Sequence, residues 1–138
     1  VGNPFSLGRI NPGETVLDIG CGCGVDAMIA GSLAGADGHA VGVDLSEDMI
    51  QRACENLELT NLKNVSFQSA SAEELPFAER TFDVVISSGA FNLVPDKLKA
   101  LREVYRVMKP GARLMIADQI LNAPMPSDTE SIISNWAR

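Results

Sequence analysis

Short runs of apolar, mostly β-branched residues alternate along the chain with segments whose apolar residues recur at helical spacing. Such near-continuous apolar runs are typical of strands buried on both faces of a parallel sheet. The five predicted strands are residues 15–19, 40–44, 65–68, 82–87 and 113–121. Because strands alternate with helices, we expect right-handed crossovers. The pattern therefore predicts an α/β fold: a three-layer α/β/α, doubly wound, mostly parallel sheet.

The intervening helices are marked by their ends. A small-residue helix over 27–34 is ended by the glycine-containing turn 35–38, and Ser46 and Asp96 are expected N-caps of the next two helices. The buried stripe of the second helix is predicted to be Ile50, Ala53, Cys54 and Leu57. The third helix is predicted to carry Leu98, Leu101, Tyr105 and Met108 on one side. It should stop at Lys109-Pro110-Gly111, and a last helix is predicted over 127–138.

Length and composition narrow the class of protein. The 138 residues, 46% hydrophobic and 21% charged, suffice for one domain with a core. The formal net charge of −7 opposes a broad nucleic-acid or anionic-membrane surface, and no apolar run reaches the ~18 residues of a membrane span. Three cysteines form no disulfide framework, so a reduced, cytoplasmic protein is expected.

Doubly wound sheets bind ligands beyond the carboxyl ends of their strands. Candidate chemistry therefore falls at residues 18–24, 44–49, 70–73 and 87–92. The most informative of these segments carries glycines at 20, 22 and 24, directly after the first strand. Alternate glycines permit a sharp turn and let a ligand approach the main chain closely.

A dinucleotide site is one interpretation of this loop. Residues 22–27 fit the pattern G-x-G-x-x-A, and Asp44 lies twenty positions after Gly22. Against this, Asp18 precedes the first glycine and Asp26 stands at the helix start, where both would repel a pyrophosphate. Carboxylates there favour a ligand with positive charge and no phosphate, such as S-adenosylmethionine, which has an ammonium and a sulfonium group.

Several further motifs carry a family resemblance. The glycine loop, the acid that ends the second strand, and the segments "AEELPF", "FDVVIS" and "VMKPGARL" resemble the class I S-adenosylmethionine-dependent methyltransferases, from about residue 13 to residue 121. The segments "GNPFSLGRINPGETVLDIGCGCGVD" and "FNLVPDKLKALREVYRVMKPG" are most similar to the arsenite methyltransferase branch. The resemblance implies a Rossmann-like methyltransferase fold, S-adenosylmethionine as cofactor and a small-molecule acceptor.

The resemblance also implies which residues hold the cofactor. They are Asp18, Gly20, Cys21, Gly22, Gly24, Asp44, Leu45, Met49, Ser71, Ala72, Glu73, Ser87 and Ser88. Asp18 would orient the amino group of the cofactor, and Asp44 would accept both ribose hydroxyls, because two carboxylate oxygens can accept two O–H donors. Ser71 stands where the family usually has an acid.

Neither an arsenic site nor a catalytic residue follows from the sequence. Arsenite methyltransferases hold arsenic with cysteine thiolates, and the family cysteine after the fourth strand corresponds to Gly89 here. Cys21 and Cys23 are expected to be small side chains tolerated between glycines, and Cys54 an inert residue on a buried stripe. The single histidine, His39, falls at the opposite end of the sheet. We therefore expect no metal. The acceptor stays open between arsenite, a quinone-type molecule, another small metabolite and no physiological acceptor at all.

The family's sheet usually has two strands beyond the fifth, so residues 1–138 are expected to be one S-adenosylmethionine-binding domain, truncated after strand five, from a longer chain. Strand five would then be an open edge that invites a homodimer. The alternatives to a methyltransferase are a nicotinamide-dependent oxidoreductase and a non-catalytic S-adenosylmethionine-binding module.

Overall fold

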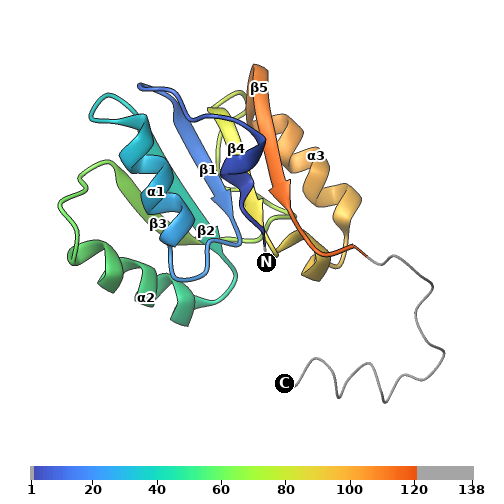
Figure 1. Cartoon of the computed structure of the whole chain (residues 1–138). Helices are drawn as coiled ribbons and strands as arrows, with labels where there is room; N and C mark the ends of the chain where they lie inside the picture. The colour runs from blue at the N-terminus through green and yellow to red at the C-terminus, as the bar shows by residue number, and fades with distance from the viewer. Residues whose placement is uncertain (1, 121–138) are drawn as a thin grey trace.

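The computed structural model describes residues 2–120, which form one parallel sheet with helices on both faces (Figure 1). The strands are β1 (Thr15–Ile19), β2 (His39–Asp44), β3 (Val65–Ser69), β4 (Phe82–Ser88) and β5 (Met108–Ala117). The helices are α1 (Val25–Ala34), α2 (Glu47–Glu58), α3 (Lys97–Val107) and the 3-10 turns η1 (Pro4–Leu7) and η2 (Phe91–Leu93). The strand order is β3-β2-β1-β4-β5. The predicted doubly wound α/β fold is thus confirmed.

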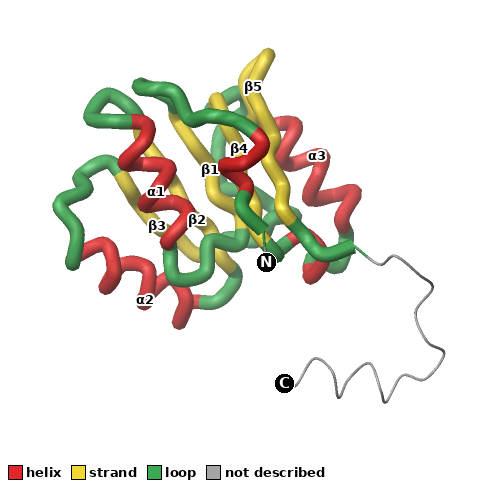
Figure 2. Tube along the Cα trace, in the orientation of Figure 1, coloured by secondary structure: helices red, strands yellow, loops and turns green. Residues whose placement is uncertain are grey.

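The order in which the strands join the sheet reverses at β1. From β1 the chain runs outward through β2 to β3, and then returns to place β4 on the other side of β1 and β5 beyond it. Right-handed crossovers consequently place α1 and α2 on one face and α3 on the other (Figure 2). The carboxyl ends of β1 and β4 therefore flank the switch point, where a doubly wound sheet opens a crevice for ligands.

Each face of the sheet has its own apolar core. On one face the alanines of α1 pack on Val16 and Val84. On the other face Ala100, Val104 and Val107 of α3 pack with Leu17 of β1 and Val85 of β4. Small side chains let both helices lie close to the sheet, so the strand ends that surround the switch point are held from both sides.

The two predicted N-caps of α2 and α3 are confirmed. The Ser46 hydroxyl accepts from the Met49 amide at 3.3 Å, and the Asp96 carboxylate accepts from the Lys99 amide at 2.9 Å. Both caps satisfy amides that a helix start would otherwise leave without a partner. They fix where α2 and α3 begin, and both helices begin beside the carboxyl ends of the strands.

Three predictions about the helices and the last strand were wrong. Met108, expected on the third helix, begins β5 instead, and the side of α3 that carries Leu98, Leu101 and Tyr105 is exposed, while smaller residues pack on the sheet. Cys54 is exposed on α2 rather than part of its buried stripe. The strand β5 begins at Met108, and Lys109-Pro110-Gly111 lies within it, beside a register shift between Phe82 and Val84.

The side of α3 that packs on the sheet is selected by the demand for close approach. The pattern Leu98, Leu101 and Tyr105 has helical spacing, but so has the set Ala100, Val104 and Val107, which allows the helix axis to sit nearer the sheet. The predicted helix over 127–138 and the end of the predicted last strand at residue 121 lie outside the described residues. None of the helices within residues 2–120 is long and apolar enough to cross a membrane.

Candidate functional site

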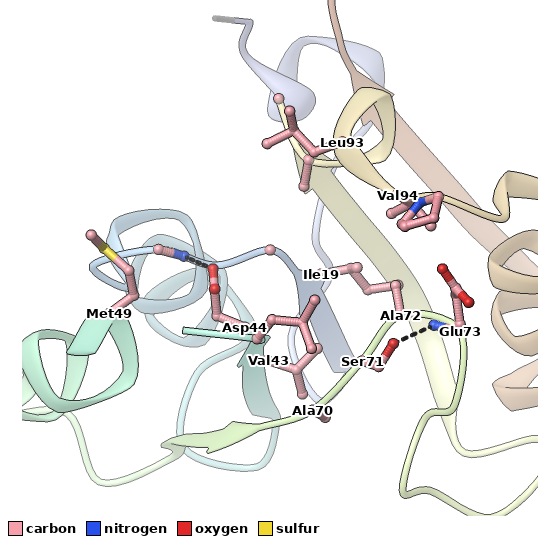
Figure 3. Close-up of a pocket in the computed structure, with 16 residues that line it drawn as sticks. Ile19, Val43, Asp44, Met49, Ala70, Ser71, Ala72, Glu73, Leu93 and Val94 are labelled. Atoms are coloured by element: carbon pink, nitrogen blue, oxygen red, sulfur yellow. Dashed lines mark hydrogen bonds between the residues drawn. The ribbon is translucent and has the colours of Figure 1, made fainter. Parts of the chain in front are cut away.

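A pocket of about 370 Å³ opens at the carboxyl ends of the strands around the switch point (Figure 3). Its walls come from the segments after β1, β2, β3 and β4, which are far apart in the sequence. The lining residues are Ile19, Gly20, Gly22, Val43, Asp44, Leu45, Met49, Ala70, Ser71, Ala72, Glu73, Gly89, Ala90, Leu93, Val94 and Pro95. Eight of the thirteen residues expected to hold a cofactor are among them.

The loop after β1 forms the floor of the pocket with bare main chain. Gly20 and Gly22 both have positive φ, at 69° and 51°, which a side chain would strain. A Cβ on Gly20 would collide with that of Ala90, whereas a Cβ on Gly22 would meet no atom within 4 Å. Glycine at 20 therefore lets the loops after β1 and β4 touch, and glycine at 22 leaves open space beside the main chain.

Asp44, at the end of β2, is the carboxylate most firmly held at the pocket. Its Oδ2 accepts from the Gly22 amide at 2.9 Å (Figure 3). Its Oδ1 accepts from the Ser46 amide at 2.9 Å. A carboxylate has about four acceptor positions, so roughly two remain for O–H donors of a ligand. The same two bonds tie the glycine loop to the start of α2.

The segment after β3 forms a second wall. The Ser71 hydroxyl accepts from the Glu73 amide at 3.1 Å, so it stabilises its own turn. The Glu73 carboxylate accepts from the Asp96 amide at 3.1 Å, which joins this wall to the start of α3. Ala70 and Ala72 add apolar surface. On the other side Met49 and the largely exposed Leu45 extend the pocket over the end of β2.

The wall formed by Leu93, Val94 and Pro95, at the end of η2 and directly after it, was not predicted from the sequence. Gly89 and Ala90 fell within the expected segment 87–92 but were not assigned a role. The signal for the apolar wall was present in the run "NLVPDK", whose apolar residues do not fit a buried strand or helix. The Lys97 ammonium donates to the carbonyls of Asn92 and Val94 at 3.3 and 2.9 Å and so holds this wall in place.

Five of the expected residues lie outside the pocket lining. The Ser87 hydroxyl donates to the Ile19 carbonyl at 3.0 Å and is fully buried, and the Ser88 hydroxyl donates to the Gly2 carbonyl at 3.4 Å. A Cβ on Gly24 would run into the ring of Phe67, so this glycine serves close packing. The remaining two, Cys21 and Asp18, are buried beneath the loop.

Burial changes the acid–base behaviour of these last two groups. Asp18 is 2% exposed, and its Oδ2 has no hydrogen-bond partner among the residues that the structure describes. Burial, reinforced by the nearby charges of Asp26 and Asp44, raises its pKa to about 8. Burial also raises the pKa of the Cys21 thiol, and the Asp18 charge adds to this. The Cys21 thiol is therefore a poor source of thiolate.

The charges at the pocket are of one sign. Asp44 and Glu73 are acidic, and none of the lysines, arginines and the histidine within residues 2–120 lines the pocket. Such a lining suits a ligand with positive charge and opposes a phosphate. Within residues 2–120, no three His, Cys, Asp or Glu side chains gather in a way that could hold a metal ion.

A doubly wound parallel sheet with a glycine loop at the switch point and an acid that ends β2 defines a Rossmann-like nucleoside-binding domain. Comparison with known proteins identifies the family. The family described as "Methyltransferase domain" matches residues 10–138, and the chain belongs to this family, the class I S-adenosylmethionine-dependent methyltransferase domains.

Relatives and solved structures agree with this assignment. An arsenite methyltransferase of Halobacterium salinarum is 41% identical over 94% of this chain and 33% of its own length. A demethylmenaquinone methyltransferase of Listeria welshimeri is 38% identical over 83% of this chain and 48% of its own. A SAM-dependent methyltransferase from Aquifex aeolicus has a TM-score of 0.78 and 27% identity over 96% of this chain and 76% of its own. The chain thus spans about a third to a half of these curated relatives.

Proposed function

We propose that the chain binds S-adenosylmethionine and transfers its methyl group to a small-molecule acceptor. The position of Asp44 is the observation that supports the proposal most strongly. Asp44 is the last residue of β2, and its carboxylate lies at a pocket that no cationic side chain within residues 2–120 lines. The amides of Gly22 and Ser46 donate to this carboxylate and hold it in place. Free acceptor positions on Asp44 suit the two hydroxyls of a ribose, and the acidic lining suits the positive charges of the cofactor.

The described residues fit this cofactor. The bare main chain at Gly20 and Gly22 leaves room for its amino-acid portion, and Leu45, Met49 and Ala72 offer apolar surface for the adenine. When bound, S-adenosylmethionine supplies a methyl group bonded to a positively charged sulfur, and this sulfur leaves as a neutral thioether. The protein's own task is alignment and exclusion of water, because an in-line displacement depends mainly on the position of its partners. We propose Leu93, Val94 and Pro95 as the wall that excludes water.

The acceptor is proposed only as a class, a small molecule. The relatives named above are an arsenite and a demethylmenaquinone methyltransferase. The described cysteines do not favour an arsenic site: the Cys21 thiol is buried with a raised pKa, the Cys23 thiol donates to the Met49 sulfur at 3.8 Å, and Cys54 is exposed on α2.

Two alternatives have weaker support. A nicotinamide-dependent oxidoreductase must hold a pyrophosphate, which the acidic lining disfavours. A non-catalytic S-adenosylmethionine-binding module would use the same pocket, so only turnover separates it from an enzyme. We expect methyl transfer to a small acceptor in an activity screen of the protein.

Titration calorimetry tests the proposal. S-Adenosylhomocysteine should bind, and NAD should not. Asp44→Ala should weaken S-adenosylhomocysteine binding by about 1.5–3 kcal/mol, or roughly 10- to 150-fold in Kd, the typical value for hydrogen bonds to a charged group. Asp48→Ala is the matched control, because Asp48 is exposed in the first turn of α2 and does not line the pocket. Unchanged affinity in Asp44→Ala, or binding of NAD alone, would reject the assignment.

A homodimer through the edge of the sheet is our proposal for the protein's assembly. Among the described strands, β5 pairs with β4 alone, so its other edge is open. An open strand edge presents backbone donors and acceptors that a second copy could pair with. The other edge strand, β3, exposes the polar side chains of Ser66 and Gln68, whereas β5 partly exposes the apolar Leu114, which makes β5 the more favourable edge.

A further inference from the structure

Asp18 is a buried acid beside the pocket to which the proposed reaction has given no part. It lies on β1, and the next residue, Ile19, lines the pocket (Figure 3). Its side chain is almost completely buried, and its Oδ2 has no hydrogen-bond partner within residues 2–120. A carboxylate in such a place loses water without gaining a partner, which disfavours its charged form. Asp18 consequently keeps its proton at a pH where an exposed aspartate has lost it.

The groups that act on Asp18 include no positive charge. Burial is the main cause that raises its pKa to about 8, and the negative charges of Asp26 on α1 and Asp44 on β2 add to it. The Ala27 amide is the group that favours the charged carboxylate. The Cys21 thiol also lies close enough to feel the charge of Asp18. At pH 7 Asp18 is therefore about nine-tenths protonated.

The strands on either side of Asp18 do not alter this balance. Asp18 pairs with Gly42 of β2 and with Ile86 of β4, and neither residue is charged. The pocket beside it is lined by no cationic side chain from the described part of the chain. The positive charge that would stabilise ionised Asp18 is thus one that a ligand can bring.

Asp44 shows that the pocket and Asp18 are coupled electrostatically. Its carboxylate lies at the pocket, and its negative charge contributes to the raised pKa of Asp18. A positive charge on a ligand in the same pocket acts on Asp18 with the opposite sign, because the Coulomb energy changes sign with the charge. Such a ligand makes the ionised form of Asp18 more favourable.

We propose that Asp18 releases its proton to the solvent when a cationic cofactor binds in the pocket, and takes a proton back from the solvent when that positive charge is lost. This inference rests on the proposed binding of S-adenosylmethionine. The sulfur of S-adenosylmethionine is positively charged and that of S-adenosylhomocysteine is neutral, so Asp18 distinguishes the methyl donor from its product by charge. Because Asp18 does not line the pocket, it is a positioning residue that acts through charge.

The affinity for S-adenosylmethionine should consequently rise with pH, because binding that releases a proton is favoured when protons are scarce. Below about pH 8, the Kd should fall by about three- to tenfold for each pH unit, where tenfold corresponds to one whole proton. Above about pH 8, Asp18 is already ionised and the dependence should end. The Kd of S-adenosylhomocysteine should change less.

Titration calorimetry of the 138-residue chain at pH 7 measures the proton directly. Binding enthalpies in phosphate and in imidazole, two buffers with different enthalpies of ionisation, give the number of protons released per cofactor bound. We expect at least about half a proton for S-adenosylmethionine and less for S-adenosylhomocysteine. The amino group of either ligand would take up a proton on binding among acids, so its contribution has the opposite sign.

S-Adenosylmethionine that binds without releasing a proton would overturn the inference and leave the proposed function intact. Absence of any binding would overturn both.

Two aspartate variants locate the proton. Asp18→Asn keeps the shape of the protonated acid, so it should bind S-adenosylmethionine without proton release, and the pH dependence of the Kd relative to the parent chain should vanish. Asp26→Asn is the matched control, because the pKa of Asp26 is also raised by burial although Asp26 is only half-buried; it should retain the release. Circular dichroism verifies that each chain is folded.

Loss of the release in Asp26→Asn but not in Asp18→Asn would overturn the proposal, since the proton would then come from α1. If Asp18→Asn does not fold, the comparison of the parent chain with Asp26→Asn decides: retained release supports Asp18 as the source, and lost release overturns it.

Discussion

Two aspartates of this domain show how environment decides the role of a residue. Asp44 and Asp18 both follow apolar strand residues in the sequence, and both were expected at the cofactor. Asp44 lines the pocket with both oxygens bonded to amides, whereas Asp18 is buried below it with one oxygen that has no partner. The sequence could indicate an acid at each strand, but only the packing of the loop decides which one reaches the pocket.

The buried Asp18 predicts a pH-dependent stability. Its pKa is raised from 3.8 to about 8, mainly by burial. Between these values the folded state retains the proton that the unfolded state releases. The contribution of Asp18 is therefore fully present below about pH 4, falls by up to ~1.4 kcal/mol per pH unit as the pH rises, and is lost above about pH 8.

The variant Asp18→Asn resembles the protonated acid and should remove this dependence. Urea unfolding of the parent chain and the variant across about pH 4 to 8 measures the free energy of unfolding of each. We expect the parent to lose stability relative to the variant as the pH rises. Asp37→Asn, in an exposed turn, is the control and should run parallel to the parent. A constant difference between Asp18→Asn and the parent would show that Asp18 ionises normally.

At the scale of elements, the sequence was most informative where local chemistry decides the structure. Strand positions and the caps Ser46 and Asp96 could be predicted, because apolar runs and capping side chains act within a few residues. The buried face of α3 could not be predicted, because two sets of apolar residues have helical spacing and only packing against the sheet selects one of them. The pocket wall at Leu93 could not be predicted either, because it depends on contacts between segments far apart in the sequence. The spacing of apolar residues along the sequence does not show such long-range packing.

One long-range contact supports the junction of α1 with β3. The Asn64 side-chain amide donates to the carbonyls of Gly31 and Gly35 at 2.8 Å each and of Gly38 at 3.2 Å. These carbonyls lie at the end of α1 and in the turn after it, and those of Gly31 and Gly35 also accept from the amides of Gly35 and Gly38. Asn64 thereby connects the start of β3 to the end of α1 with a single polar group.

Asn64→Asp should test this connection with almost no change of shape. The carboxylate removes both donors and adds negative charge at the negative end of the α1 dipole. We expect the free energy of unfolding to fall by about 1–3 kcal/mol. S-Adenosylhomocysteine affinity should stay unchanged, since Asn64 precedes β3 at the end of the sheet opposite the pocket.

Asn61→Asp is the control, because Asn61 is exposed in the same connection. Urea unfolding of both variants gives the comparison. Equal stability of the two aspartate variants would mean that the three carbonyls do not depend on Asn64. A large loss of ligand affinity in Asn64→Asp would instead show that the junction and the pocket are coupled.

At the scale of the whole molecule, helices cover both faces of the sheet, and no further strand within residues 2–120 pairs with its two edges. Helices α1 and α2 protect one face, and α3 with the segment after β3 protects most of the other. Membership of the family does not show whether the edge strands of the sheet pair with another strand. The chain spans only about a third to a half of the length of its curated relatives. Assembly through an edge is therefore a property that must be measured on this chain.

Light scattering provides that measurement. Pairing of β5 with its copy predicts a mass of about twice 14.7 kDa that falls toward the monomer on dilution. Leu114→Lys should favour the monomer, because a lysine on an edge strand opposes pairing, whereas Gln68→Lys on β3 should leave the dimer intact. Leu101→Lys should also remain dimeric, since its side chain is on the exposed side of α3 and not on the strand edge. A monodisperse monomer with a high melting temperature would contradict edge pairing, and a dimer that Leu101→Lys dissociates would place the interface on the exposed side of α3 instead.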